Sequence, residues 1–355
     1  MQFSIRRTWS LLVCLLFVGL SIVGCGGSSS GPTSPAVNMT LKVGTIVDAI
    51  PFFPLYVAEQ ENYFKTQGLT LDPPTLPLLG SGAKLATAVE AGSLEVGVGA
   101  LTDAFTMSRV DSYIRVAGAV TNDFLLDIVV TRQFEQQAHL TAASPLADKV
   151  KALVGKKVGI SSPNSATDAL VTYLFRQQGL DAQKDVTKVS VGAATAADLA
   201  ALQSGRIDAV VVGAPGGVQA ELQGIGDTFI SPVRGDIPSM QGQLFGVIYL
   251  KQSVIDAKPK AVQAFVRAIA QAETFIQNNP DQVIVLLQKY LKLDQKTVSA
   301  AWSAAKPSMP LTPQISQQGY ETANQFHVKA GLMAVSLAYN DLVATDTINK
   351  ALIGS

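Results

Sequence analysis

From residue 40 onward, short apolar runs alternate with stretches whose apolar positions recur at helical spacing. Runs of β-branched and other apolar residues predict buried strands at residues 41–47, 69–71, 94–98 and 114–120. Helical spacing, twice closed by a glycine, predicts helices at residues 54–67, 80–91 and 102–110. This order of strands and helices is typical of a mostly parallel sheet with helices on both faces.

The same alternation occurs a second time farther along the chain. It predicts strands at residues 126–131, 157–160, 189–191, 208–212 and 244–250, and helices at residues 165–178, 196–203 and 217–223. After Ser253 the pattern is helical as far as Leu352. We therefore predict an α/β protein of two lobes, each with a mostly parallel sheet, joined by two crossings. The predicted bounds are 39–120 with 250–355 for lobe 1, and 121–249 for lobe 2.

The first 38 residues do not fit this pattern. Arg6 and Arg7 precede an apolar run of 13 residues, Leu11 to Val23, which is shorter than the roughly 20 residues of a membrane-spanning helix. The run is typical of the core of a secretory signal, so residues 1–24 are predicted to be a signal peptide. Residues 25–38 are rich in Gly, Ser and Pro and are expected to form a flexible tether.

The signal ends in the sequence Ile22-Val23-Gly24-Cys25. This resembles the bacterial lipobox, in which the cysteine becomes the lipidated first residue of the mature protein. The resemblance implies that Cys25 carries a lipid and anchors the chain to the extracytoplasmic side of a bacterial membrane, in the cell envelope or periplasm. The alternative is an ordinary signal peptide with an incidental cysteine.

Composition and charge exclude several classes of protein. Lys and Arg number 27 and so do Asp and Glu, which argues against a nucleic-acid-binding surface. There are two cysteines and two histidines, His139 and His327, too few for a disulfide scaffold or a His-rich metal centre. Cys14 lies in the signal. We expect neither a metal nor another cofactor.

Four blocks of the chain match one protein family in their order and spacing. They read PLYVAEQENYFKTQGL, AGSLEVG, LVGKKVGI and SGRIDA, at residues 54–69, 91–97, 153–160 and 204–209. In these blocks the chain resembles the substrate-binding proteins of nitrate/sulfonate/taurine-type ABC transporters, with Asn62 and Glu95 where that family usually has Gly and Asp. The resemblance implies a bilobal type II periplasmic-binding fold with a double-crossover hinge. It also implies a monomer that closes on a small molecule and delivers it to a membrane permease without altering it.

In open α/β sheets, ligands bind beyond the carboxyl ends of the strands, and this rule selects the candidate binding residues. Three of the selected loops begin helices with Ser81, Ser165 and Thr195, where free N–H groups favour an anion. These side chains could equally be helix caps. The predicted ligand-binding residues are Asp48, Ile50, Phe52, Ser81, Gly82, Thr102, Asn122, Asp123, Ser162, Asn164, Ser165 and Ala214.

Asp48 is the candidate that indicates a ligand chemistry. It follows a predicted strand and precedes Phe52 and Phe53, so it could accept a hydrogen bond from an ammonium or ring N–H group, or be a solvated turn residue. We expect an organic ligand such as a sulfonate, a carboxylate or a heterocycle. The alternatives to a transport protein are an enzyme of the thiamine-pyrimidine or menaquinone type on the same fold, and a sensory binding lobe.

Overall fold

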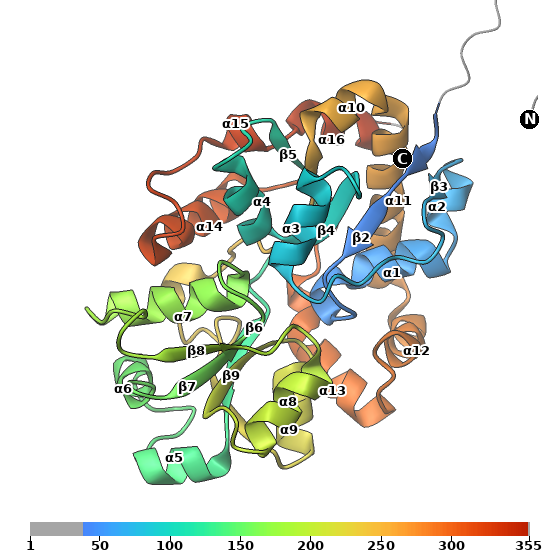
Figure 1. The fold of residues 1–355 in the computed structure, drawn as a ribbon. Helices are drawn as coiled ribbons and strands as arrows, with labels where there is room; N and C mark the ends of the chain where they lie inside the picture. The colour runs from blue at the N-terminus through green and yellow to red at the C-terminus, as the bar shows by residue number, and fades with distance from the viewer. Residues whose placement is uncertain (1–37, 354–355) are drawn as a thin grey trace, which may run out of the picture. The chain divides into compact units, whose positions relative to one another are not determined.

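The computed structural model describes residues 38–353, which contain two larger β-sheets, one short two-stranded sheet and the helices around them (Figure 1). The predicted signal peptide, Cys25 and the tether as far as residue 37 lie outside the described residues. Within 38–353, no helix combines the length and the apolar character that crossing a membrane requires.

The first sheet has four strands in the order β2 (Val43–Thr45), β4 (Val96–Ala100), β11 (Gly246–Lys251) and β5 (Ile114–Thr121). β2 pairs with β4 in parallel, and β11 runs antiparallel to both β4 and β5. Three strands therefore point the same way and β11 is reversed. A separate short parallel pair joins β1 (Thr40–Leu41), just before β2 in the chain, to β3 (Thr70–Leu71).

The second sheet has five strands in the order β10 (Asp227–Ile230), β6 (Leu126–Val130), β9 (Ala209–Gly213), β7 (Lys157–Ile160) and β8 (Thr187–Ser190). β7 pairs in parallel with β8 and β9, while β6 is antiparallel to both of its neighbours. The expectation of two mostly parallel sheets is thus confirmed in strand direction, with one reversed strand in each sheet.

Helices occupy the connections and the C-terminal part of the chain. Those of the first 250 residues are η1 (Ile50–Phe52), α1 (Phe53–Gln60), α2 (Tyr63–Thr66), α3 (Gly82–Glu90), α4 (Leu101–Ser108), α5 (Arg132–Ala138), α6 (Leu146–Ala152), α7 (Ala166–Gln177), α8 (Thr195–Gln203), α9 (Gly216–Leu222) and η2 (Pro238–Met240). The others are α10 (Gln252–Ala257), α11 (Pro259–Asn278), α12 (Pro280–Leu291), α13 (Gln295–Ala305), η3 (Lys306–Ser308), α14 (Gln317–Ala330), α15 (Tyr339–Leu342) and α16 (Thr345–Leu352).

Both faces of the second sheet are covered by helices, as its unbroken apolar strands predict. Along β9, Val211 packs into a core with α7 and α14, whereas Val210 and Val212 pack into a separate core with α8 and α9. Successive strand residues point to opposite faces, so a strand buried on both sides cannot alternate with polar residues. The run of valines in β9 follows from this constraint.

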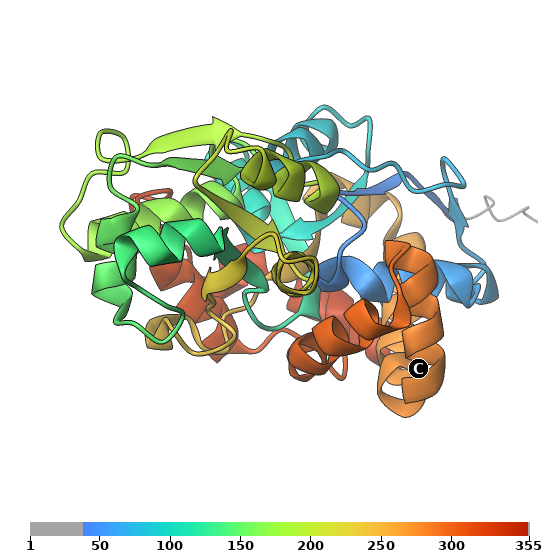
Figure 2. The ribbon, with the colours of Figure 1, turned by 90° about the horizontal axis from the view of Figure 1, so that it is seen from below.

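We call the elements around the first sheet the first half of the protein and those around the second sheet the second half. The C-terminal helices contact both halves. α11 packs on α1, α16 and β5 of the first half, whereas α14 packs on α7 of the second. Phe326 and Ala330 of α14 belong to the core of the second sheet, where the ring of Phe326 lies 5.0 Å from that of Tyr173. Figure 2 shows these orange and red segments extending along both halves.

Three local features differ from the sequence-based expectations. β11 is bonded into the first sheet, so the expected boundary at residue 249 cuts through this strand and the second crossing falls before Gly246. The helix expected at 54–67 is divided into α1 and α2 by Asn62, whose φ of 59° is left-handed. The sequence pattern does not predict helices α5 and α6 or strand β10, because these elements, of 7, 7 and 4 residues, are too short to show a clear period.

His327 joins the C-terminal part of the chain to the first half. Its Nε2 atom lies 2.7 Å from the Thr102 hydroxyl of α4, and its Nδ1 atom lies 2.6 Å from the carbonyl oxygen of Ala323. The ring is 1% exposed. Burial lowers the pKa of His327 from 6.5 to about 4, against the opposing effect of the Ala323 hydrogen bond, because a charged imidazolium is poorly solvated there.

We predict that His327 makes stability pH-dependent. Its folded-state pKa is depressed, so its contribution is complete above pH 6.5 and is lost as the pH falls toward 4; a shift of this size corresponds to roughly 3 kcal/mol. In urea unfolding, the wild type should lose about this much stability relative to His327→Gln over that interval. The exposed His139→Asn variant should follow the wild type. An equal pH dependence in all three proteins would contradict the prediction.

Candidate functional site

A pocket lies between the two sheets, where the carboxyl ends of their strands face each other. The cavity that it encloses has a volume of about 60 Å³. Ile46 follows β2, Ala100 ends β4, Ser161 follows β7 and Gly213 ends β9. The position beyond the strand ends is the one expected from the sequence.

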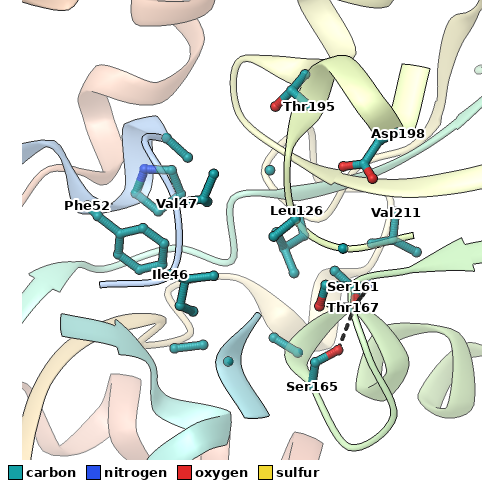
Figure 3. A pocket seen from close by; sticks show the side chains of 18 of the residues that line it. Ile46, Val47, Phe52, Leu126, Ser161, Ser165, Thr167, Thr195, Asp198 and Val211 are labelled. Carbon is teal, nitrogen blue, oxygen red and sulfur yellow. Dashed lines mark hydrogen bonds between the residues drawn. The ribbon is translucent and has the colours of Figure 1, made fainter. Parts of the chain in front are cut away.

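The two walls of the pocket differ in chemistry, as Figure 3 shows. The side chains of Ile46, Val47 and Phe52 come from the first half and form an apolar wall. Opposite them, the second half contributes most of the polar side chains. They are Ser161, Ser165, Thr167, Thr195 and Asp198.

Three hydroxyl groups of the second half form one hydrogen-bonded cluster at the start of α7. The Thr167 hydroxyl lies 3.0 Å from that of Ser161 and 2.8 Å from that of Ser165, and it accepts a hydrogen bond from the Ser161 N–H group at 2.8 Å. Ser165 also donates to the carbonyl oxygen of Ser162 at 2.7 Å. The cluster fixes the side chains at this end of the pocket in one arrangement.

Asp103 lies at the junction of the pocket and two helix ends. Its Oδ2 atom accepts a hydrogen bond from the N–H group of Ala100, the N-cap of α4, at 3.1 Å. A Cβ atom built on Gly82, the first residue of α3, would lie 2.7 Å from the Asp103 carboxyl carbon. Gly82 is therefore required for space: the carboxyl group fits only because this residue has no side chain.

Asp198 is the second carboxyl group that lines the pocket, and it comes from the first turn of α8 in the other half. The residue is 3% exposed, and its Oδ1 atom has no hydrogen-bond partner among the described residues. Burial raises the pKa of Asp198 to about 7, and burial also raises that of Asp103 to about 7, the latter against the lowering effect of the Ala100 N–H group. Both groups are therefore poorly solvated as carboxylates.

The pocket lining has acidic but no basic side chains. None of the described residues that line it is Lys, Arg or His. Lys84, the only cation in the loops selected from the sequence, is exposed on α3. Lys188 of β8 is in the same half as α7 and α8, but its ammonium group is paired with Asp168 at 2.6 Å. A bound molecule would meet hydroxyls, carboxyls, backbone and apolar groups.

Of the twelve residues predicted to bind ligand, Phe52, Gly82 and Ser165 line this pocket. Ser81 and Ser165 cap their helices, accepting hydrogen bonds from the N–H groups of Lys84 and Asp168, whereas Thr195 is not a cap. For Ser165 the capping and the pocket-lining interpretations therefore hold together, because the same hydroxyl serves the helix end and faces the cavity.

Several predicted residues lie in other surroundings. Asp48 lines a different hollow beside Tyr290 and Lys292, where burial raises its pKa and Lys292 opposes that rise. Thr102 is turned into its contact with His327. Asn164 lines a separate hollow and is exposed, with its N–H group donating to Asp168 at 2.8 Å.

The remaining predicted residues also lie outside the lining of this pocket. Ile50 is fully buried, and its N–H group donates to the carbonyl oxygen of Ala214 at 3.0 Å. In the crossings, Asn122 donates its N–H group to Ser308 at 2.8 Å, and Asp123 Oδ1 accepts from Gly242 at 3.1 Å. Ser162 is half-buried, and its hydroxyl has no partner among the described residues.

The sequence-based choice of residues does not include either carboxyl group of the pocket. Asp103 and Thr195 stand in loops that the strand-end rule selects, and Asp198 follows one helical turn after such a loop. Extending the rule by one turn into each helix would include Asp198. No comparable signal identifies Phe245, which enters the pocket from the second crossing because of the path of the chain.

We predict that Gly82→Ala destabilises the protein by about 1–3 kcal/mol, because the added methyl group must displace the Asp103 carboxyl. The same substitution in an Asp103→Ala background should cost much less, since the obstructing group is gone. Urea unfolding of the four proteins of this double-mutant cycle measures the coupling. Additive effects would show that the two residues do not compete for space.

Comparison with known proteins finds relatives that match most of the chain. YtlA of Bacillus subtilis is 22% identical over 323 residues, which are 87% of this chain and 89% of that protein. A structure from Bordetella bronchiseptica superposes with a TM-score of 0.77 at 23% identity and covers 89% of this chain and 98% of its own. The alkanesulfonate-binding protein of Xanthomonas axonopodis pv. citri, solved with bound MOPS, superposes with a TM-score of 0.68 at 18% identity. The match covers 87% of this chain and 100% of that protein's chain.

These structures confirm the expected bilobal α/β fold of periplasmic binding proteins. Residues 34–287 match the NMT1-like family, which also confirms the resemblance found in the four sequence blocks. Because this match spans more than half of the sequence, the chain belongs to the NMT1-like family.

Proposed function

We propose that this chain is the extracytoplasmic solute-binding component of an ABC importer. The observation that supports this most is the pocket: two sheets contribute opposite walls, and the strand ends of both converge on one small cavity. A molecule bound there would contact both halves at once. The fold is also that of the alkanesulfonate-binding relative.

The proposed mechanism is closure of the two halves around the ligand. We place lobe 1 at 39–121 and 246–355, and lobe 2 at the residues between these two ranges. The second part of lobe 1 then begins at residue 246 and not at residue 250, because β11 belongs to the first sheet. The two crossings touch through Asp123 and Gly242, and a ligand that bridges the walls stabilises the closed state by its higher affinity for it. A membrane permease then takes up the ligand from the closed monomer.

The residues near the pocket support binding over catalysis. A serine nucleophile needs an adjacent base, but Ser165 donates its proton to the Ser162 carbonyl and none of the described lining residues is a histidine. His327 is engaged with Thr102 and Ala323 away from the lining. An enzyme on the same fold is the alternative, and turnover of a bound molecule would reveal it.

Closure can be measured with spin labels. We predict that labels at Lys84→Cys and Asn164→Cys, both exposed and on opposite halves, approach each other when a low-molecular-weight cell extract is added. Pulsed dipolar spectroscopy measures the distance. The pair Asn164→Cys with Lys184→Cys lies within the second half and should not change. A cross-half distance that no extract alters would argue against the solute-binding function.

We also propose that Cys25 carries the lipid that keeps the chain at the membrane. Cys25→Ser should move the protein from the membrane fraction to the soluble fraction and abolish incorporation of labelled palmitate. Cys14→Ser is the matched control, because Cys14 lies before the expected cleavage site and should not matter. Identical fractionation of wild type and Cys25→Ser would exclude the anchor.

A further inference from the structure

Four of the helices that begin at the pocket, α3, α4, α7 and α8, have the protein's own carboxyl groups at their N-terminal ends. Asp103 accepts the Ala100 N–H group at the start of α4 and lies against Gly82 at the start of α3. At α7, Asp168 accepts the Asn164 N–H group and pairs with Lys188. Helix N-termini attract anions, but here that attraction is already directed at side chains of the chain itself.

At α8 the corresponding carboxyl group has no such role. Asp198 is in the first turn, yet its Oδ1 atom accepts no hydrogen bond from the described residues although the residue is only 3% exposed. The group lines the pocket and in Figure 3 lies between Thr195 and Val211. A buried carboxyl oxygen without a partner is costly in a folded protein, and a ligand that donates to it removes that cost.

The apolar surfaces of the pocket indicate the body of the ligand. Phe52 and Phe245 provide aromatic surface, and Ile46, Leu126 and Val211 provide aliphatic surface. These groups offer no hydrogen bonds, so they suit a compact apolar or aromatic portion. The ligand implied by the whole lining has one polar donor end and an apolar remainder.

We propose that the pocket binds a small organic cation, an amine or a protonated nitrogen heterocycle, whose N–H group donates to Asp198 while its apolar part packs on Phe52. This rests on the proposed solute-binding function and specifies its ligand class. A sulfonate or another anion would be placed beside the Asp103 and Asp198 carboxyls without a basic side chain in the described lining to compensate for it. The chain then differs in ligand charge from its alkanesulfonate-binding relative.

The test compares three probes with one apolar body and different heads: benzylamine, benzyl alcohol and phenylmethanesulfonate. The measurement is made at pH 8, above the pKa values of about 7 to which burial raises Asp103 and Asp198, so that both are ionised. Binding is followed by saturation-transfer NMR, which detects weak fragments. The variants are Asp198→Asn and, as matched control, Asp148→Asn, an exposed first-turn carboxylate of α6.

The wild type and Asp148→Asn should bind benzylamine best and phenylmethanesulfonate least. Asp198→Asn should weaken benzylamine by about tenfold or more, the effect of losing a charged hydrogen bond, and leave benzyl alcohol nearly unchanged. The ligand class is overturned if the sulfonate binds best, if Asp198→Asn keeps the preference for the amine, or if the amine does not bind.

The stability of the protein without ligand gives a second readout for Asp198. At pH 8, Asp198→Asn should unfold at a higher temperature than the wild type, because a buried carboxylate is replaced by a neutral group; a purely structural Asp198 would give the opposite result. If the sulfonate binds and the spin-labelled halves still close, only the ligand class fails. If no probe binds and no extract causes closure, the solute-binding function fails as well.

Discussion

The positive ends of helices α3, α4, α7 and α8 converge on one pocket, and this charge must be balanced by negative groups. The strand order produces much of the convergence, since β4, β7 and β8 lead into α4, α7 and α8, while α3 follows the short strand β3. Asp103 and Asp168 supply the balance at α4 and α7 through hydrogen bonds to backbone N–H groups. The arrangement leaves little of the helix dipoles available to a bound anion.

This constraint also explains the local sequence around the pocket. Gly82 has no side chain because the Asp103 carboxyl occupies the space beside it. Lys188 is used to neutralise Asp168, which leaves the lining without a described cation. The hydroxyls of Ser161, Ser165 and Thr167 bond mainly to one another. Asp198 is then the described lining residue with a buried side-chain atom that has no partner, and the specificity of the pocket depends on it.

The C-terminal helices contribute to the same architecture from a distance. α14 completes the core of the second half through Phe326, and its His327 contacts α4, whose N-terminus lies at the pocket. A chain segment far from the strand-end loops therefore supports the helix that presents Asp103.

The order of strands and helices was predictable, because periodicity and helix-ending residues are local properties of the chain. The loops at the strand ends followed from that order, and three of the residues predicted to bind ligand, Phe52, Gly82 and Ser165, line the cavity. The sheet that accepts β11, the inward turn of Thr102 toward His327 and the position of Asp48 outside the pocket depend on packing between distant segments. Asp198 became a candidate for the same reason: its sequence position is ordinary, and only burial without a partner distinguishes it.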